Sequence, residues 1–458
     1  MTPRVALAAV LLAACSSPAP IDAGTDVAIG DSSVDAAPDV TPLPPGVFEL
    51  SSTALDAPAT DLAPLAPIVA DAQVVGVGES IHTSAGYFHL RDRVLRYLVT
   101  EHGFRTVAFE SARSHVATAT EAYLQSCTGT AEDAARGIYD IWWDRSTPAV
   151  LAWLCTWNQA NPGDRVHAFG FDIRQPWIDA PSLRDFLQRS APADAATLSD
   201  GFSRCLGASF ADEPGFFTDA TVRAYYGGTM PMPQVPHDAC VAGTTAVIDY
   251  IAAHRAALVA ASSERDVEMA RLAAVDMRAF DSSIFYVSRN DLAHANPPRD
   301  DAMADVFRTV RNLDHAGTRT MIWAHNGHIM SASDQVLRGQ WAGVRNMTTQ
   351  LEQDASLHYV AIGQLSYVTD YNWFDGPTTL DLPTEDWVEY TFEQLHRPIV
   401  LIDTRAATAG PQPLFDPTAA LGAGFDVMRP ATNYRVILFQ HESVGADYFT
   451  PPSFQMMP

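Results

Sequence analysis

The chain has 458 residues, and its 54 acidic and 29 basic side chains give a formal net charge of −25. This acidic balance argues against nucleic acid or anionic lipid as a binding partner. All 29 basic residues are arginine, which excludes Schiff-base lysine chemistry, a phosphate-loop lysine and a Ser–Lys dyad.

The first residues have the pattern of an export signal. Met1–Arg4 carries one positive charge, and Val5–Leu12 is an apolar run too short to cross a bilayer. Leu12-Ala13-Ala14-Cys15 then resembles a bacterial lipobox, whose cysteine is lipidated; the alternative is an ordinary secretory peptide that contains a cysteine. We expect residues 1–15 to be a lipoprotein signal peptide, with the protein anchored through Cys15 on the periplasmic or outer-surface side of a membrane.

The composition changes after this signal. Residues 16–47 are rich in Ser, Pro, Ala and Asp with almost no large apolar side chains, which predicts a disordered tether. Residues 48–458 are long enough for two domains, or for one large domain with an insertion, and we expect a single catalytic domain. No later apolar run is long enough for a transmembrane helix.

Short apolar runs predict strands, and several of them end at ionisable side chains. In chain order the runs are Val74–Gly78 before Glu79 and His82, Thr106–Phe109 before Glu110, Val166–Phe171 before Asp172, Thr320–Ala324 before His325 and His328, His358–Ile362, Pro398–Ile402 and Tyr434–Phe439. Because they alternate with helical segments, they predict an α/β fold with a mostly parallel central sheet flanked by helices. The C-terminal ends of such strands share one edge, where ligands bind. We therefore expect these carboxylates and imidazoles to converge there.

Apolar periodicity predicts a helix over residues 86–102, and Arg91 falls on its apolar face. An unpaired buried charge is very costly, so this guanidinium is expected to pair with Glu79 or Glu110. Arg93 projects from another face and is expected to be solvated.

Further helices are predicted over Thr130–Trp157 and from about Ser182 to Ser288. We interpret residues 178–290 as a largely helical insertion that forms a lid over the C-terminal strand edge. Glu213–Pro236, rich in Gly, Pro and aromatic residues, predicts a loop within it. Its aromatic residues either line a pocket for an apolar ligand or simply hold the loop in place: Phe216, Phe217, Tyr225 and Tyr226.

If Cys15 carries lipid, four cysteines remain, and an even number in an exported protein predicts disulfides. Four cysteines allow three pairings. We favour the local pairs Cys127–Cys155 and Cys205–Cys240, because each pair lies within one predicted helical region. Buried free thiols are the alternative, and the spacing does not suit a structural zinc site.

Two common motifs are incomplete or absent. Gly76-Val77-Gly78 follows a strand, but Ile81 replaces the third glycine of a dinucleotide fingerprint and Glu79 would face the phosphates. There is also no Gly-x-Ser-x-Gly elbow for a serine nucleophile. What remains is a set of six ionisable groups expected at one edge: Glu79, His82, Arg91, Glu110, His325 and His328.

This set predicts a hydrolytic site. Imidazole has an ordinary pKa near 6.5 and can take a proton from water at neutral pH. An ester carbonyl also needs its developing oxyanion stabilised, by Arg91 or by a protonated His325 or His328. Asp172 is expected to have a supporting or structural role.

Three segments resemble the erythromycin esterase family. Gly76-Val77-Gly78-Glu79-Ser80-Ile81-His82 matches its first signature, with Phe88, Arg91, Leu95, His102-Gly103-Phe104 and Val107-Ala108-Phe109-Glu110 in register. Trp323-Ala324-His325-Asn326-Gly327-His328 is similar to its second signature, and Arg299-Asp300 with Met303-Ala304-Asp305 to a third. Thr83-Ser84 and Val306 depart from the residues usual in the family. The resemblance spans about Leu62 to Phe439.

The resemblance implies a metal-independent hydrolase that opens a macrolide lactone, or cleaves a carboxylic ester, with an activated water. By position, His82 would be the general base, and Glu79 would hold its imidazole or orient the water. Arg91, Glu110, His325 and His328 would complete the polar cluster. No cofactor is expected, and the partner is a small ester or lactone.

Two alternatives remain open. The same Glu and His side chains are good ligand types, so a divalent-metal hydrolase would use the same cluster. A membrane-anchored protein that captures haem or another apolar ligand without chemistry is the second alternative. Oligomeric state cannot be read from these patterns.

Overall fold

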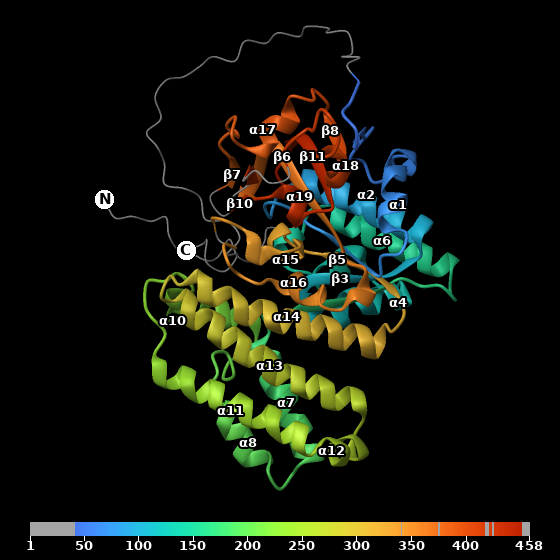
Figure 1. Ribbon diagram of the computed structural model, residues 1–458. Helices are drawn as coiled ribbons and strands as arrows, with labels where there is room; N and C mark the ends of the chain where they lie inside the picture. The colour runs from blue at the N-terminus through green and yellow to red at the C-terminus, as the bar shows by residue number, and fades with distance from the viewer. Residues whose placement is uncertain (1–41, 340, 374–375, 417–420, 424–425, 451–458) are drawn as a thin grey trace.

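The computed structural model describes residues 42–339, 341–373, 376–416, 421–423 and 426–450. Within them, a nine-stranded sheet has helices on both faces, and a separate group of helices packs to one side (Figure 1). The strands are β1 (Val47–Glu49), β2 (Val74–Val77), β3 (Phe104–Ala112), β4 (His167–Asp172), β5 (Arg319–Trp323), β6 (Val360–Trp373), β7 (Gly376–Thr379), β8 (Ile399–Asp403) and β11 (Val436–Ser443).

The sheet order is β1-β8-β11-β6-β2-β5-β3-β4, with β7 paired to β6 beside this path. Six neighbouring strands, from β11 to β4, run parallel, while β1 and β8 pair antiparallel at one side. Every strand that the sequence predicts is present, so the mostly parallel α/β fold is confirmed. Two short strands, β9 (Leu421–Ala423) and β10 (Asp426–Met428), form a separate pair.

The central strands are apolar throughout because both faces of the sheet are covered. Val107 and Met321 pack into one hydrophobic layer, whereas their neighbours Ala108 and Ile322 pack into the other. This alternation of side chains between faces is the period of a strand, and burial on both faces removes the polar alternation. The strand ends therefore project beyond a rigid core.

Helices from distant parts of the chain form the two layers. On one face lie α2 (Ala85–His102) and α6 (Ser146–Ala160), and on the other lie α14 (Leu292–Asp314) and α16 (Met347–Leu351). The first helix agrees with the prediction and stops at Gly103, whose φ of 66° is the left-handed conformation that glycine tolerates. Thr130–Trp157 is less continuous than predicted, with α5 (Ala131–Ala135) and the short turn Asp140–Trp142 before α6.

Arg93 corrects one expectation. Its side chain is buried rather than solvated, and it donates hydrogen bonds to the carbonyls of Ser52 and Pro58 and to the carboxylate of Asp61. This guanidinium therefore ties α2 to the segment that precedes the first central strand.

The helical region leaves the sheet at the end of β4 and returns through α14. It contains α7 (Pro176–Ser190), α8 (Ala195–Phe202), α9 (Glu213–Thr218), α10 (Ala220–Tyr226), α11 (Gln234–Ala253), α12 (Arg255–Ala261) and α13 (Glu264–Val287). Figure 1 shows these helices as one group, with α14 between them and the sheet. The predicted helical insertion is present at nearly the expected bounds.

The prediction that Glu213–Pro236 forms a loop is wrong, because this segment contains α9, α10 and the start of α11. Asp212 and Asp219 cap the two short helices by accepting backbone N–H bonds in their first turns. Phe216 and Tyr226 are buried against Trp177 and Phe280, so these rings hold the segment in place.

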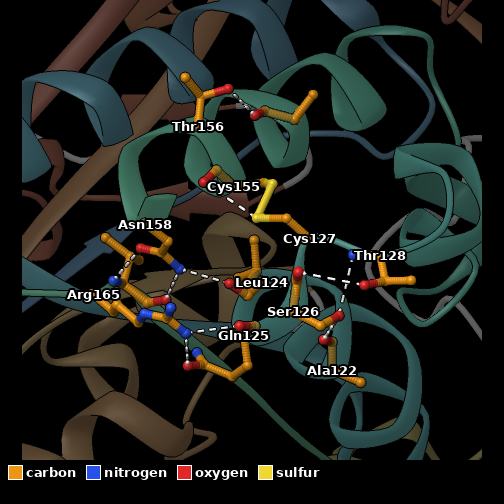
Figure 2. The surroundings of a disulfide bond; sticks show 12 residues. Ala122, Leu124, Gln125, Ser126, Cys127, Thr128, Cys155, Thr156, Asn158 and Arg165 are labelled. Atoms are coloured by element: carbon orange, nitrogen blue, oxygen red, sulfur yellow. Dashed lines mark hydrogen bonds between the residues drawn. A yellow bond between two sulfur atoms is a disulfide. The ribbon is translucent and has the colours of Figure 1, made fainter. Parts of the chain in front are cut away.

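Both favoured disulfides are present, Cys127–Cys155 and Cys205–Cys240. Figure 2 shows the first of them, which joins the end of α4 (Ala122–Ser126) to α6. Beside it, Asn158 donates hydrogen bonds to the carbonyls of Leu124 and Val166. The covalent link and the bond to Leu124 fasten α6 to α4, and the bond to Val166 fastens α6 to the chain entering β4.

The expected signal peptide, residues 1–15, and residues 16–41 of the tether lie outside the described residues. Val47, placed at the end of the tether, is already part of β1. Within the described ranges, no helix has the length and apolar character needed to cross a membrane.

Candidate active site

All six predicted site residues are buried and belong to one contact network at the C-terminal edge of the sheet. Glu79 and His82 follow β2, Glu110 lies near the end of β3, and His325 follows β5. His328 lies in the short helix α15 (Asn326–Ile329), and Arg91 comes from α2. The convergence expected from the strand ends is therefore what the structure shows.

Two local features position this edge. Gly78 has no room for a side chain, because a Cβ there would lie 2.2 Å from Oδ1 of Asn326 at the start of α15. The strand β3 has a register shift between Phe109 and Ala112, and Glu110 lies within that irregularity. Bulges of this kind re-aim side chains next to functional sites.

His82 and Glu79 form a hydrogen-bonded pair arranged like a general base and the carboxylate that orients it. Nδ1 of His82 lies 2.7 Å from Oε1 of Glu79, and both side chains are almost fully buried. A carboxylate can only accept, so the proton of this bond belongs to Nδ1. Nε2 is then the nitrogen with the lone pair when the imidazole is neutral, and no hydrogen bond to it occurs among the described residues.

Glu79 is held by two further donors. Nε1 of Trp142 donates to its Oε1 at 2.5 Å, and Arg91 donates to its Oε2. The guanidinium of Arg91 is fully buried and lies 3.5 Å from the ring centroid of Trp323. Glu79 is thus the carboxylate partner expected for Arg91, and Glu110 is not.

His325 is fixed in one neutral tautomer. Its Nε2 donates to the carbonyl of Ser80 at 3.0 Å, and its Nδ1 accepts the backbone N–H of Gly327 at 3.0 Å. Burial and the neighbouring His82 hold the pKa of His325 well below its ordinary value. Its ring lies 5.0 Å from that of His82, so it forms a wall beside the base.

His328, unlike the neutral His325, carries a positive charge at neutral pH. Burial disfavours its protonation, but the carboxylates of Asp300 and Glu110 outweigh burial and raise its pKa to about 9. Its Nδ1 lies 2.8 Å from Oδ1 of Asp300 and its Nε2 lies 3.2 Å from Oε1 of Glu110. At neutral pH both ring nitrogens therefore donate, and Nη1 of Arg299, also 3.2 Å from Nε2, makes a contact rather than a hydrogen bond.

Glu110 links His325 to the pair His328 and Arg299. It is buried, which favours the neutral acid, but His328 and Arg299 outweigh this effect and hold its pKa well below the ordinary value. Its Oε2 accepts the backbone N–H of His325 at 2.8 Å, and its Oε1 accepts from Nη2 of Arg299 at 2.8 Å. It therefore remains a carboxylate and positions the groups around it.

Arg299, Asp300 and Trp142 were not assigned site roles from the sequence. Arg299 donates from Nε and Nη2 to the two carboxylate oxygens of Asp172, at 3.0 and 2.7 Å. This pairing gives Asp172 the supporting position expected of it. In the sequence, Arg299 and Asp300 stand out only as part of a segment that resembles the family. The helix that carries them was not predicted, because the Pro297-Pro298 pair before them is untypical of a helix interior.

Two of the three imidazoles, those of His325 and His328, are not free to bind a divalent cation. A metal needs an unshared pair on each ligand nitrogen, but His328 is protonated on both nitrogens and the Nδ1 pair of His325 accepts a backbone N–H. Within the described ranges no group of three or more His, Cys, Asp or Glu side chains has metal-binding geometry.

A family model and a known relative both show sequence similarity between this chain and erythromycin esterases. The family model for erythromycin esterase matches residues 99–442, which include Glu110, Arg299, His325 and His328 but start after His82. An erythromycin esterase type II from Escherichia coli is 27% identical over 113 residues, which is 25% of this chain and 26% of that protein. The sequence match to this relative thus spans about a quarter of its length.

Solved structures share the fold over most of the chain. A mutant of the erythromycin esterase EreC in its open conformation has a TM-score of 0.70 and 17% identity, covering 88% of this chain and 99% of that one. A succinoglycan biosynthesis protein and a Bacillus cereus protein have TM-scores of 0.65 and 0.66, with 18% and 16% identity; each comparison covers 88% of this chain, and 96% and 97% of theirs. The matched family model extends over most of the chain, and the chain therefore belongs to the erythromycin esterase family.

Proposed function

We propose that this protein is a hydrolase of carboxylic esters or macrolide lactones that uses water as the nucleophile. The observation that carries the proposal is the buried pair in which His82 donates from Nδ1 to Glu79, with Nε2 left to act on water. Nε2 would take a proton from water while the water oxygen bonds to the acyl carbon. The tetrahedral intermediate then breaks its C–O bond, and the proton passes from His82 to the departing alcohol oxygen.

The oxyanion of that intermediate needs a donor, and Arg299 supports this role better than the groups expected from the sequence. Arg91 is fully buried against Trp323 and bound to Glu79, and both nitrogens of His325 and His328 are already engaged. Among the described residues, the neighbour of Nη1 of Arg299 at hydrogen-bonding distance is Nε2 of His328, at 3.2 Å, so its N–H groups would be available for a developing negative charge.

A metal-free mechanism is consistent with the fixed imidazole states, which leave neither His325 nor His328 as a ligand for a divalent cation. The metal-dependent alternative would require both rings to lose hydrogen bonds and His328 to lose its proton. We therefore favour activated water without a cation.

Hydrolysis of p-nitrophenyl butyrate and of erythromycin, before and after exhaustive treatment with EDTA, tests this function. We expect turnover of at least one of them, with the same kcat before and after the chelator. Loss of activity that returns with Zn²⁺ or Mn²⁺ would establish the metal-dependent alternative. Tight binding of haem or of an apolar ligand, without turnover of either ester, would establish the binding-only alternative.

We also propose that the protein is exported and anchored to a membrane through lipidated Cys15. The two disulfides support export, because such bonds persist in oxidising compartments. Its partner in solution is then a small ester or lactone, not nucleic acid, in keeping with the strong negative charge.

A further inference from the structure

In the part of the chain that the structure describes, two tyrosine hydroxyls beside the site have no hydrogen-bond partner. Oη of Tyr139 and Oη of Tyr226 are both fully enclosed, and neither makes a hydrogen bond within the described ranges. A buried hydroxyl left without a partner lowers the stability of the fold, because the loss of its hydration is not compensated. Such a pair is therefore hard to explain by the stability of the fold alone.

The two phenols come from different parts of the molecule. Tyr139 directly precedes the Asp140–Trp142 turn, on the sheet side, whereas Tyr226 is the last residue of α10 in the helical region. The ring of Tyr139 stacks on Trp142, whose indole N–H holds the carboxylate of Glu79. Tyr226 is fixed by its contacts with Phe216 and Phe280.

The charged groups at the end of β4 act on both phenols. The guanidinium of Arg174 lies 5.7 Å from the ring centroid of Tyr139 and 3.6 Å from the carboxylate of Asp172. Burial raises the pKa of both tyrosines well above its ordinary value, and the charges of Asp172, Arg174 and Arg299 act on both hydroxyls. Arg299, the proposed oxyanion donor, is thus one of the charges that act on both hydroxyls.

A third group shares this environment. Glu213, at the start of α9, contributes to the electrostatic surroundings of both phenols, and burial together with Asp140 raises its pKa to about 7. Near neutral pH this part of the site therefore presents two phenols and a carboxyl group that takes up a proton far more readily than an exposed one. Such groups suit the uncharged hydroxyl and carbonyl oxygens of a substrate better than an ionic one.

We propose that Tyr139 and Tyr226 are substrate-binding residues, whose hydroxyls bind uncharged oxygen functions of a polyoxygenated ester or lactone on the side of Arg299 that faces the helical region. This inference rests on the proposed hydrolase function. It adds that the helical region contributes directly to specificity, because one of the two hydroxyls comes from α10.

Substitution by phenylalanine removes only the hydroxyl, and its effect on stability separates the two roles. If the hydroxyls serve the substrate, Tyr139→Phe and Tyr226→Phe will unfold in urea at the same or a higher concentration than the unsubstituted protein, because an unpaired buried group is removed. Tyr359→Phe is the matched control. Its part-buried hydroxyl donates to the carbonyl of Ile329 at 2.5 Å, so this variant should unfold at lower urea concentration.

Calorimetric titration of the His82→Asn protein with erythromycin, a hydroxyl-rich macrolide lactone, measures binding without turnover. We expect each added Tyr→Phe substitution to raise the Kd about two- to tenfold, the usual effect of losing one uncharged hydrogen bond. Binding of ω-pentadecalactone, a macrolactone without hydroxyls, should not change. Tyr359→Phe in the same background should leave both affinities unaltered.

Three results would overturn this inference: unchanged erythromycin affinity in both Tyr→Phe variants, a loss of stability as large as in Tyr359→Phe, or no binding of erythromycin at all. Because these measurements need no turnover, they are independent of the hydrolase proposal. If erythromycin binding depends on the two hydroxyls but the unsubstituted protein hydrolyses no ester, the proposed function fails and the binding site stands.

Discussion

Three histidines share one buried site and differ in their protonation because each has different partners. His82 has one nitrogen held by a carboxylate and the other without a hydrogen-bond partner among the described residues. His325 is neutral because it donates to a carbonyl and accepts a backbone N–H, and His328 is a cation because it lies between two carboxylates. Only His82 can accept a proton without losing a hydrogen bond.

Replacing Glu79 by Gln tests how the base is oriented. An amide cannot accept from both His82 and Arg91 through two oxygens, so one of these bonds must be lost. We expect kcat/KM for ester hydrolysis to fall by about 10² or more. Loss of one partner of the buried pair should also lower the free energy of unfolding by about 3–5 kcal/mol.

Glu121→Gln is the matched control, because Glu121 holds His167 at 2.8 Å in a partly exposed pair. It should retain full kcat/KM. An active, stable Glu79→Gln enzyme would show that the carboxylate of Glu79 does not orient the base.

Arg299→Lys tests the oxyanion donor. Lysine keeps the positive charge but cannot donate to Asp172 and Glu110 and also present further N–H groups to the substrate. We expect kcat to fall by about 10²–10³ with little change in KM, because the donor acts on the transition state. Arg265→Lys, in an exposed pair with Asp314, should have no effect. A change in KM alone would assign Arg299 to ground-state binding.

The sequence predicted which residues meet here but not what each one does. Glu79, His82, Glu110, His325 and His328 follow apolar strands, and parallel topology alone brings strand ends together. Protonation states depend on partners from other segments, such as Ser80 for His325 and Asp300 for His328. No local pattern contains that information.

At the scale of elements, α14 does most to complete the site. Its consecutive residues Arg299 and Asp300 have different partners. Arg299 donates to Asp172 and Glu110, whereas Asp300 pairs with His328. The sequence did not predict this helix, because prolines inside a helical pattern remove backbone hydrogen bonds and usually mark its end. Tertiary packing against α13 and β4 stabilises α14 despite them.

Asp300→Asn tests the charge of His328 through the pH dependence of stability. The pKa of His328 is raised to about 9 in the folded protein, above its ordinary value near 6.5. Protonation therefore stabilises the fold fully below about pH 6.5, and this contribution is lost as the pH rises to about 9. Without the Asp300 carboxylate the decline should become smaller and occur at lower pH.

Urea unfolding between about pH 6 and pH 10 measures this decline, and the difference between the two proteins isolates the contribution of Asp300. The asparagine can still accept the backbone N–H of Met347, as Asp300 does, so this hydrogen bond and the local backbone geometry should be retained. Parallel pH profiles for the two proteins would contradict a cationic His328.

In the whole molecule, two hydrophobic layers cover the faces of the sheet, and one helical region extends from its edge. One disulfide lies in a helical layer beside the sheet and the other within the helical region. The sheet and the insertion could be predicted, because apolar runs are local signals, and the disulfide pairs were favoured because each pair lies within one predicted helical region. The helices α9 and α10 could not, since short capped turns among Gly, Pro and aromatic residues resemble a loop.

Cys15→Ser tests the membrane anchor. Thioether lipidation requires the cysteine sulfur, so we expect the variant to move from the membrane fraction to the soluble exported fraction of the producing bacterium. Its disulfides and its specific activity should not change, because Cys15 precedes the folded domain. A wild-type protein that is already soluble after export would contradict the anchor and favour an ordinary secretory signal.

The most direct test of the whole account is the ester hydrolysis rate of His82→Asn, measured beside His441→Asn, whose histidine is exposed and pairs with Glu393. We expect His82→Asn to lose about 10²–10⁴-fold or more in kcat/KM while its thermal unfolding stays cooperative and His441→Asn keeps full activity. Hydrolysis by His82→Asn at the rate of the unsubstituted enzyme would contradict this expectation.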